Sequence, residues 1–166
     1  MNPDTPGSKP CFMMDHMVIK LGKYLRIIGY DVEWDMGIRT HDLIQRANAT
    51  GRIFITRNSH LAEQFPPALA SLVLSETDPA LQFRTLVEKF ALDTQTALFS
   101  RCIRCNVELT IVANKQEAQP LVHPNVYLRQ DRFFRCPHCN TIFWHGSHVT
   151  NTCRKLSLPA ASLAGR

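Results

Sequence analysis

The sequence predicts an α/β fold: a parallel sheet with helices on both faces, followed by a small zinc ribbon. Three observations support this. Short apolar segments alternate with helical patterns up to about residue 90, prolines and cysteines become frequent after Leu92, and four of the six cysteines form two C-x-x-C pairs. A chain of 166 residues is long enough for one ordinary domain or two small ones. We expect a first domain over residues 11–95 and the ribbon over residues 96–155.

The first domain begins with a strand. Cys11–Met14 is a short apolar run that ends at Asp15, which is typical of a buried strand. From Met17 to Ile28 apolar residues recur at helical spacing, and Gly29 is a suitable residue to end that helix. Asp31–Trp34 is predicted to be the second strand.

The same alternation continues along the chain. A helix is expected from Thr40 to about Ala49, a strand over Arg52–Thr56, and a short helix around Leu61. Ser71–Ser75 is the fourth predicted strand, and a helix follows from Pro79 to about Phe90. Short strands that alternate with helices favour a parallel sheet, because each crossover needs a helix to return the chain.

The cysteine pairs predict a metal site. Cys102 and Cys105 form one pair, Cys136 and Cys139 the other, and 30 residues separate them. Zinc prefers a tetrahedron of thiolates, and each C-x-x-C turn can aim two of them at one ion. Two reduced or redox-active cysteine pairs are the alternative. Between the pairs, residues 108–112 and 126–129 are predicted to be strands of the ribbon.

Both chain ends are polar or loosely patterned, so residues 1–10 and 156–166 are expected to be flexible tails. The sequence shows no signal peptide and no apolar run long enough to cross a membrane, which favours a cytoplasmic protein.

Positive charge is concentrated in the second half. Residues 1–99 carry 10 basic and 11 acidic side chains, whereas residues 100–155 carry 8 and 3. This distribution suggests that the second half holds a polyanion such as RNA, although a merely solvated surface is the alternative. The basic residues expected to contact RNA are Lys20, Lys23, Arg57, Arg101, Arg104, Arg129, Arg132 and Arg135. Four aromatic residues lie among the last of these and offer stacking faces or ribbon core: Phe133, Phe134, Phe143 and Trp144.

Polar residues follow the predicted strands, where an open parallel sheet usually binds its ligand. Asp15 directly ends the first strand, Arg57 and Asn58 follow the third, and Asp42 lies in the first turn of the second helix. Carboxylates that converge there could hold Mg²⁺ or Mn²⁺. Helix capping by Asp15 or Asp78, and complementation of a helix dipole by Asp42, are the structural alternatives.

Several motifs together resemble a known family. FMMDHMVIKLGKYLRIIGYDV, RIFITRN, FSRCIRCNVEL and FFRCPHCNTIFWHGSHV are similar to the Mut-seven C-terminal RNase family, including its Trp-x-Gly-Ser-His signature at Trp144–His148. The resemblance covers about residues 11–152. It implies a PIN-like nuclease fold, metal-dependent cleavage of RNA, and Asp15 as the leading acid for the catalytic metal.

This chain departs from the family pattern at two positions. The family's Thr-Arg-Asp is Thr56-Arg57-Asn58 here, and Thr40 stands where the second helix usually begins with an acid. Either the chain is a weak or inactive nuclease, or Asn58 is an introduced substitution. We therefore carry three hypotheses: a metal-dependent ribonuclease using Asp15, Asp42 and Asn58, a non-catalytic RNA-binding module, and a protein-interaction adaptor built on the ribbon.

Overall fold

The computed structural model describes residues 9–65 and 67–158. The predicted N-terminal tail, except residues 9 and 10, and residues 159–166 of the predicted C-terminal tail lie outside this part of the chain.

The first half contains a fully parallel four-stranded sheet, in the order β2-β1-β3-β4. Its strands are β1 (Phe12–Met14), β2 (Val32–Glu33), β3 (Ile53–Thr56) and β4 (Ser71–Val73). Phe12 pairs with Val32 on one side and with Ile53 on the other. The two central strands β1 and β3 therefore end side by side at one edge of the sheet.

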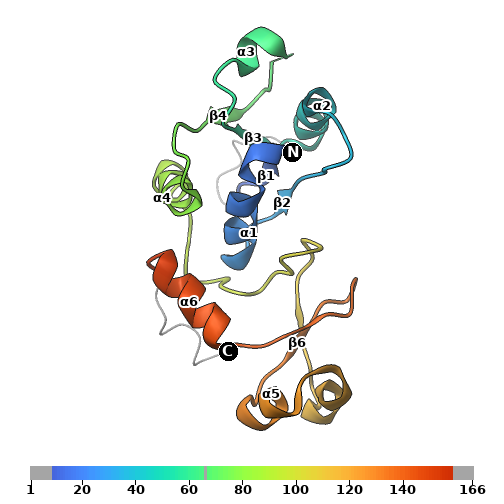
Figure 1. Ribbon diagram of the computed structural model, residues 1–166. Coiled ribbons are helices and arrows are strands. Elements are labelled where there is room, and N and C mark those ends of the chain that lie inside the picture. The colour runs from blue at the N-terminus through green and yellow to red at the C-terminus, as the bar shows by residue number, and fades with distance from the viewer. Residues whose placement is uncertain (1–8, 66, 159–166) are drawn as a thin grey trace.

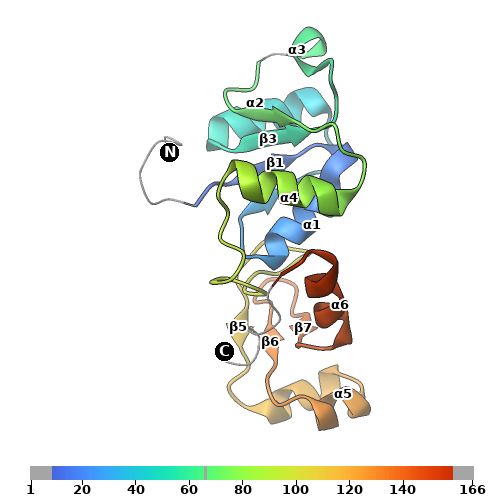
Figure 2. The same ribbon diagram turned by 90° about the vertical axis from the view of Figure 1, so that its left-hand side faces the viewer.

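Helices cover both faces of the sheet, which confirms the predicted class (Figures 1 and 2). They are the 3-10 turn η1 (His16–Val18), α1 (Ile19–Ile27), α2 (Thr40–Thr50), α3 (Leu61–Gln64) and α4 (Pro79–Lys89). Successive residues of β1 point to opposite faces. Phe12 and Met14 are buried in a cluster with α1 and α4, whereas Met13 is buried with α2.

Two helix ends follow directly from the sequence. Gly51 ends α2 in the left-handed conformation, with φ at 65°. Asp78 caps α4 by accepting hydrogen bonds from the backbone N–H groups of Ala80 and Leu81, at 2.7 and 3.1 Å. Asp78 is therefore a helix-capping residue, one of the two roles that the sequence allowed for it.

The second half contains a small antiparallel sheet, in the order β5-β6-β7 (Figure 1). Its elements are β5 (Thr110–Ile111), the 3-10 segment η2 (Lys115–Leu121), α5 (Pro124–Arg129), β6 (Phe134–Arg135), β7 (Ile142–Phe143) and α6 (Ser147–Lys155). Phe133, 1% exposed, packs with Ala118 and Ile142 in a separate ribbon core.

The strand predicted at residues 126–129 is wrong, because this segment belongs to α5. Pro124 occupies the first turn, and Nδ1 of His123 accepts a hydrogen bond from the N–H of Asn125 at 3.2 Å. Proline at the first helical position with a capping side chain before it outweighs the strand preference of Val126 and Tyr127.

The tail predicted from Leu156 is also wrong in its first residues. Leu156 and Leu158 are 4% and 7% exposed, and they are buried with Val149 and Cys153 in the core of the first half. Residues 149, 153 and 156 lie on one side of a helix. The chain thus returns from the ribbon to the first half through α6, as Figure 1 shows.

Candidate active site and metal centre

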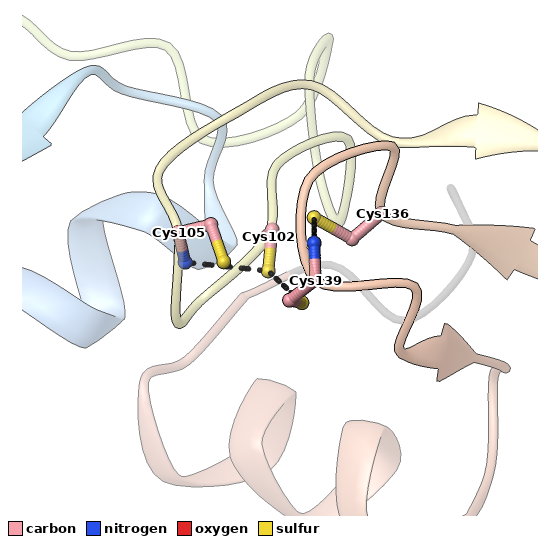
Figure 3. Close-up of side chains that lie close together, drawn as sticks. All are labelled: Cys102, Cys105, Cys136 and Cys139. Carbon is pink, nitrogen blue, oxygen red and sulfur yellow. Dashed lines mark hydrogen bonds between the residues drawn. The ribbon is translucent and has the colours of Figure 1, made fainter.

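The two C-x-x-C turns bring their four cysteines close together (Figure 3). Their Sγ atoms all lie within 4.8 Å of one another, and those of Cys102 and Cys139 are 3.9 Å apart. Zinc–sulfur bonds of about 2.3 Å in a tetrahedron place sulfur atoms about 3.8 Å apart. The donor set therefore fits a structural metal ion such as zinc. Among the described residues, this cluster is the one group of three or more metal-binding side chains that lie this close together.

Each C-x-x-C turn is built to hold its first sulfur. The N–H of Cys105 donates to Sγ of Cys102, and the N–H of Cys139 donates to Sγ of Cys136, both at 3.4 Å. Burial raises the pKa of the Cys102 thiol. A bound cation would offset this cost, because a thiolate is the form that binds metal.

An asparagine closes each turn in the left-handed conformation. Asn106 has a φ of 65° and Asn140 a φ of 57°, and asparagine tolerates this region better than most residues. Their backbone N–H groups donate to the carbonyl oxygens of Cys102 and Cys136, at 3.0 and 2.9 Å.

The first turn is also attached to the edge strand of the parallel sheet. Oδ1 of Asn106 accepts a hydrogen bond from the N–H of Val32 at 3.0 Å, and its Nδ2 donates to Asp31 at 2.7 Å. Asp31 in turn pairs with Arg52 at 2.7 Å. The asparagine side chain thus accepts a hydrogen bond from the edge strand β2, as the backbone of a neighbouring strand would.

A buried arginine reinforces this attachment from α1. Arg26 donates to the carbonyl oxygens of Val32, Ile103 and Arg104, at 2.5 to 3.0 Å, and its guanidinium lies 3.5 Å from the ring centre of Trp34. Burial lowers its pKa to about 10. The two halves are therefore joined by polar contacts at the metal-binding turn.

A second candidate site lies at the carboxyl ends of β1 and β3. Asp15 is 4% exposed; its Oδ1 accepts a hydrogen bond from the N–H of His16 at 2.7 Å, and its Oδ2 accepts one from Oγ1 of Thr56 at 2.5 Å. It borders a cavity of about 360 Å³. The cavity is also lined by His16, Thr40, Arg57, Asn58 and Ser59. Asp15 therefore both caps η1 and faces the candidate site.

Asn58 lines this cleft with its amide already engaged. Its Oδ1 accepts a hydrogen bond from the N–H of His60, and its Nδ2 donates to Gln64, both at 3.0 Å. Arg57 follows β3 directly, and within residues 9–65 and 67–158 its buried Nε has no hydrogen-bond partner. The cleft thus combines one carboxylate, Asp15, with the positive charge of Arg57.

Asp42 lies elsewhere and is not among the residues that line the cleft. Its carboxylate, 37% exposed, pairs with Arg39 and His41, both at 3.2 Å. Since α2 begins at Thr40, residue 42 is rotated by about 200° around the helix axis. Thr40, rather than Asp42, lines the cleft together with Asp15.

His16 was not among the candidate residues of the sequence analysis. It is half-buried and lines the cleft, and its Nε2 lies 2.9 Å from the carbonyl oxygen of Asp35. In the sequence, the position of His16 directly after Asp15 was the signal that could have identified it as a site residue.

The predicted RNA-contacting residues differ in their surroundings. Lys20, Lys23, Arg104, Arg129 and Arg132 are exposed. Arg101 is half-buried and bonds to the carbonyl oxygens of Gly29 and Asn106. Arg135 is half-buried, and within the described residues its Nε has no hydrogen-bond partner.

Comparison with protein families decides the relationship. The family model described as "Mut7-C RNAse domain" matches residues 10–156, which is most of the chain. The chain belongs to the Mut7-C RNAse domain family. This confirms the resemblance seen in the sequence motifs, and it associates the chain with RNA and with a nuclease-like family. No curated protein and no solved structure gave a significant match.

Within this Mut7-C chain, none of the helices that the structure describes has the length and apolarity needed to span a bilayer.

Proposed function

We propose that this Mut7-C domain cleaves RNA phosphodiester bonds at the Asp15 cleft, with an activity limited by Asn58 and Thr40. The position of Asp15 is the observation that supports this proposal most strongly. A carboxylate that is almost fully buried at the end of a central strand, and held by the Thr56 hydroxyl, faces an open cleft beside Arg57. Packing of the sheet does not require a carboxylate at this position.

The donor set fits a divalent cation only in part. Mg²⁺ in proteins commonly binds one or two carboxylates, several waters and the phosphates of the substrate. Asp15 supplies one carboxylate, and the Asn58 carbonyl and the Thr40 hydroxyl are neutral. We therefore expect Mg²⁺ or Mn²⁺ to be held by Asp15 together with the RNA phosphate, and weakly without RNA. When bound, the ion would lower the pKa of a water molecule and so supply the nucleophile.

The protein's own groups have separate roles in this proposal. The Thr56 hydroxyl and the N–H of His16 hold the Asp15 carboxylate in its orientation. Arg57 places a fixed positive charge where the scissile phosphate would lie. A guanidinium can form paired hydrogen bonds with the oxygens of a phosphate.

The decisive experiment changes residue 58. We expect Asn58→Asp to raise Mn²⁺-dependent cleavage of a labelled RNA and also to tighten Mn²⁺ binding measured by electron paramagnetic resonance. The fold should tolerate this change, because the introduced carboxylate can still accept from the N–H of His60 and the Gln64 amide can rotate to donate to it. Gln119→Glu, on an exposed position of the ribbon, is the control for added negative charge.

Two further variants test whether Asp15 or Asp42 is required for cleavage. Asp15→Asn in the Asn58→Asp background should abolish cleavage, whereas Asp42→Asn should retain it. Equal activity and equal Mn²⁺ affinity with aspartate or asparagine at position 58 would contradict the assignment of this cleft.

The second candidate function is non-catalytic RNA binding through the basic ribbon. The observation that favours it is the single carboxylate in the cleft. RNA binding that falls steeply with salt, without cleavage by either residue 58 variant, would support this function over the first.

A further inference from the structure

An apolar cavity lies between the ribbon sheet, the end of α1 and helix α6, away from the Asp15 cleft. Its volume is about 130 Å³. Aromatic side chains form much of its wall: Phe99, Phe134, Phe143 and Trp144. Ile27 closes it from α1, and Thr152 borders it from α6.

The volume of the cavity suits one aromatic ring. A comparable apolar cavity of about 150 Å³ in another protein binds benzene. Phe134 and Phe99 both pack against His145, with ring centres 5.3 and 5.8 Å apart, and Trp144 stands perpendicular to His148 at 5.8 Å. Neighbouring rings that are held in this way offer stacking and edge contacts to a further ring.

The chemistry around the cavity favours a nucleic acid over an apolar protein side chain. Arg101 and His148 border it, and the segment that builds most of it, residues 100–155, has 8 basic and 3 acidic side chains. A base in such a cavity would leave its phosphate among cations, whereas an apolar peptide would gain nothing from them.

We propose that this cavity binds a single unpaired nucleobase of RNA, of pyrimidine size. This inference rests on the proposed RNA-directed function and adds to it a contact that reads the base rather than the phosphate. Phe134, Phe143 and Trp144 provide the apolar faces, while the net positive charge of residues 100–155 attracts the RNA backbone.

The first test compares two ligands that share the same phosphates. Binding of a fluorescently labelled ten-residue oligouridylate and of an abasic oligomer of equal length is measured by anisotropy with the full chain. We expect the oligouridylate to bind roughly 5- to 150-fold more tightly, the range that corresponds to stacking of one base. Equal affinities would overturn the cavity proposal and leave RNA binding intact, whereas no binding of either oligomer would overturn both.

A cavity-filling variant locates the contact. Thr152→Phe places a ring in the cavity, and Thr150→Phe on the exposed side of α6 is its matched control. Thr152→Phe should reduce oligouridylate affinity to the abasic level without a lower melting temperature, and Thr150→Phe should change neither. A preference for bases that survives in Thr152→Phe with its fold intact would contradict the assignment.

A measurement on the unaltered protein covers the case in which the variant fails to fold. Stacking of a base shifts the NMR signals of nearby methyl groups through its ring current. Titration with oligouridylate should therefore shift the methyl signals of Ile27 and Val149, and the abasic oligomer should not. Shifts caused instead by an apolar peptide alone would overturn the proposal and assign the cavity to a protein partner.

Discussion

Replacing Asn106 tests how strongly the metal-binding turn is attached to the sheet. Asn106→Gly keeps the left-handed backbone that residue 106 needs, because glycine adopts it freely, and removes both side-chain hydrogen bonds. The change therefore isolates the contact between the turn and β2.

The expected loss follows from the two partners. The N–H of Val32, a residue with 0% exposure, is left without an acceptor, which costs about 1 to 3 kcal/mol. Loss of the bond to Asp31 adds less than about 1 kcal/mol, since that carboxylate is partly exposed and keeps Arg52. We expect the free energy of unfolding to fall by about 1 to 4 kcal/mol, and the melting temperature by roughly 2 to 16 °C for a chain of this length.

The matched control is Asn140→Gly. Asn140 has the same place and the same backbone conformation in the second turn, and its exposed side chain makes no hydrogen bond to the described residues. Urea unfolding of the zinc-loaded protein, followed by circular dichroism and tryptophan fluorescence, gives both free energies. If Asn106→Gly and Asn140→Gly were equally stable, the attachment through Asn106 would be energetically unimportant and the reasoning refuted.

Three further outcomes are expected. Purified protein should contain one zinc per chain, and chelation should loosen the ribbon before the parallel sheet; metal analysis that finds none would exclude the four-cysteine site as a zinc site. Removing Arg104 and Arg132 together should weaken RNA binding and reduce its salt dependence by about two ion equivalents, and an unchanged slope would place the RNA elsewhere. Hydrogen bonds from Thr96 and Gln95 lower the pKa of Asp93 from 3.8 to about 2, so its stabilising effect should be complete above about pH 5 and lost as the pH falls through 2. Asp93→Asn should therefore lower the melting temperature at pH 7, and the difference from the unaltered protein should shrink as the pH falls from about 5 towards 2.

The parallel sheet could be predicted from sequence because its signals are local. β1 and β3 are continuous apolar runs, and Gly51 and Asp78 mark helix ends by their own backbone and side-chain chemistry. The metal site was equally accessible, since two C-x-x-C pairs constrain the sulfur positions within each turn.

Two predictions failed, one because local preferences competed and the other because the burial of a segment depends on the tertiary structure. Residues 126–129 contain strand-favouring side chains, but Pro124 and His123 start a helix just before them. The segment from Leu156 looks loosely patterned by itself, and only the continuation of α6 onto the first half buries it.

By itself, the sequence determined the strands of the parallel sheet, the helices between them, the four-cysteine site and the family, because each depends on residues close together in the chain or on a specific motif. The tertiary structure alone decided that Thr40 rather than Asp42 lines the cleft with Asp15, that Asn106 and Arg26 join the ribbon to the sheet, and that distant aromatic residues enclose a cavity. These features depend on helix rotation and on contacts between residues far apart in the chain, such as Arg26 with Arg104, 78 positions away, and no local pattern specifies them.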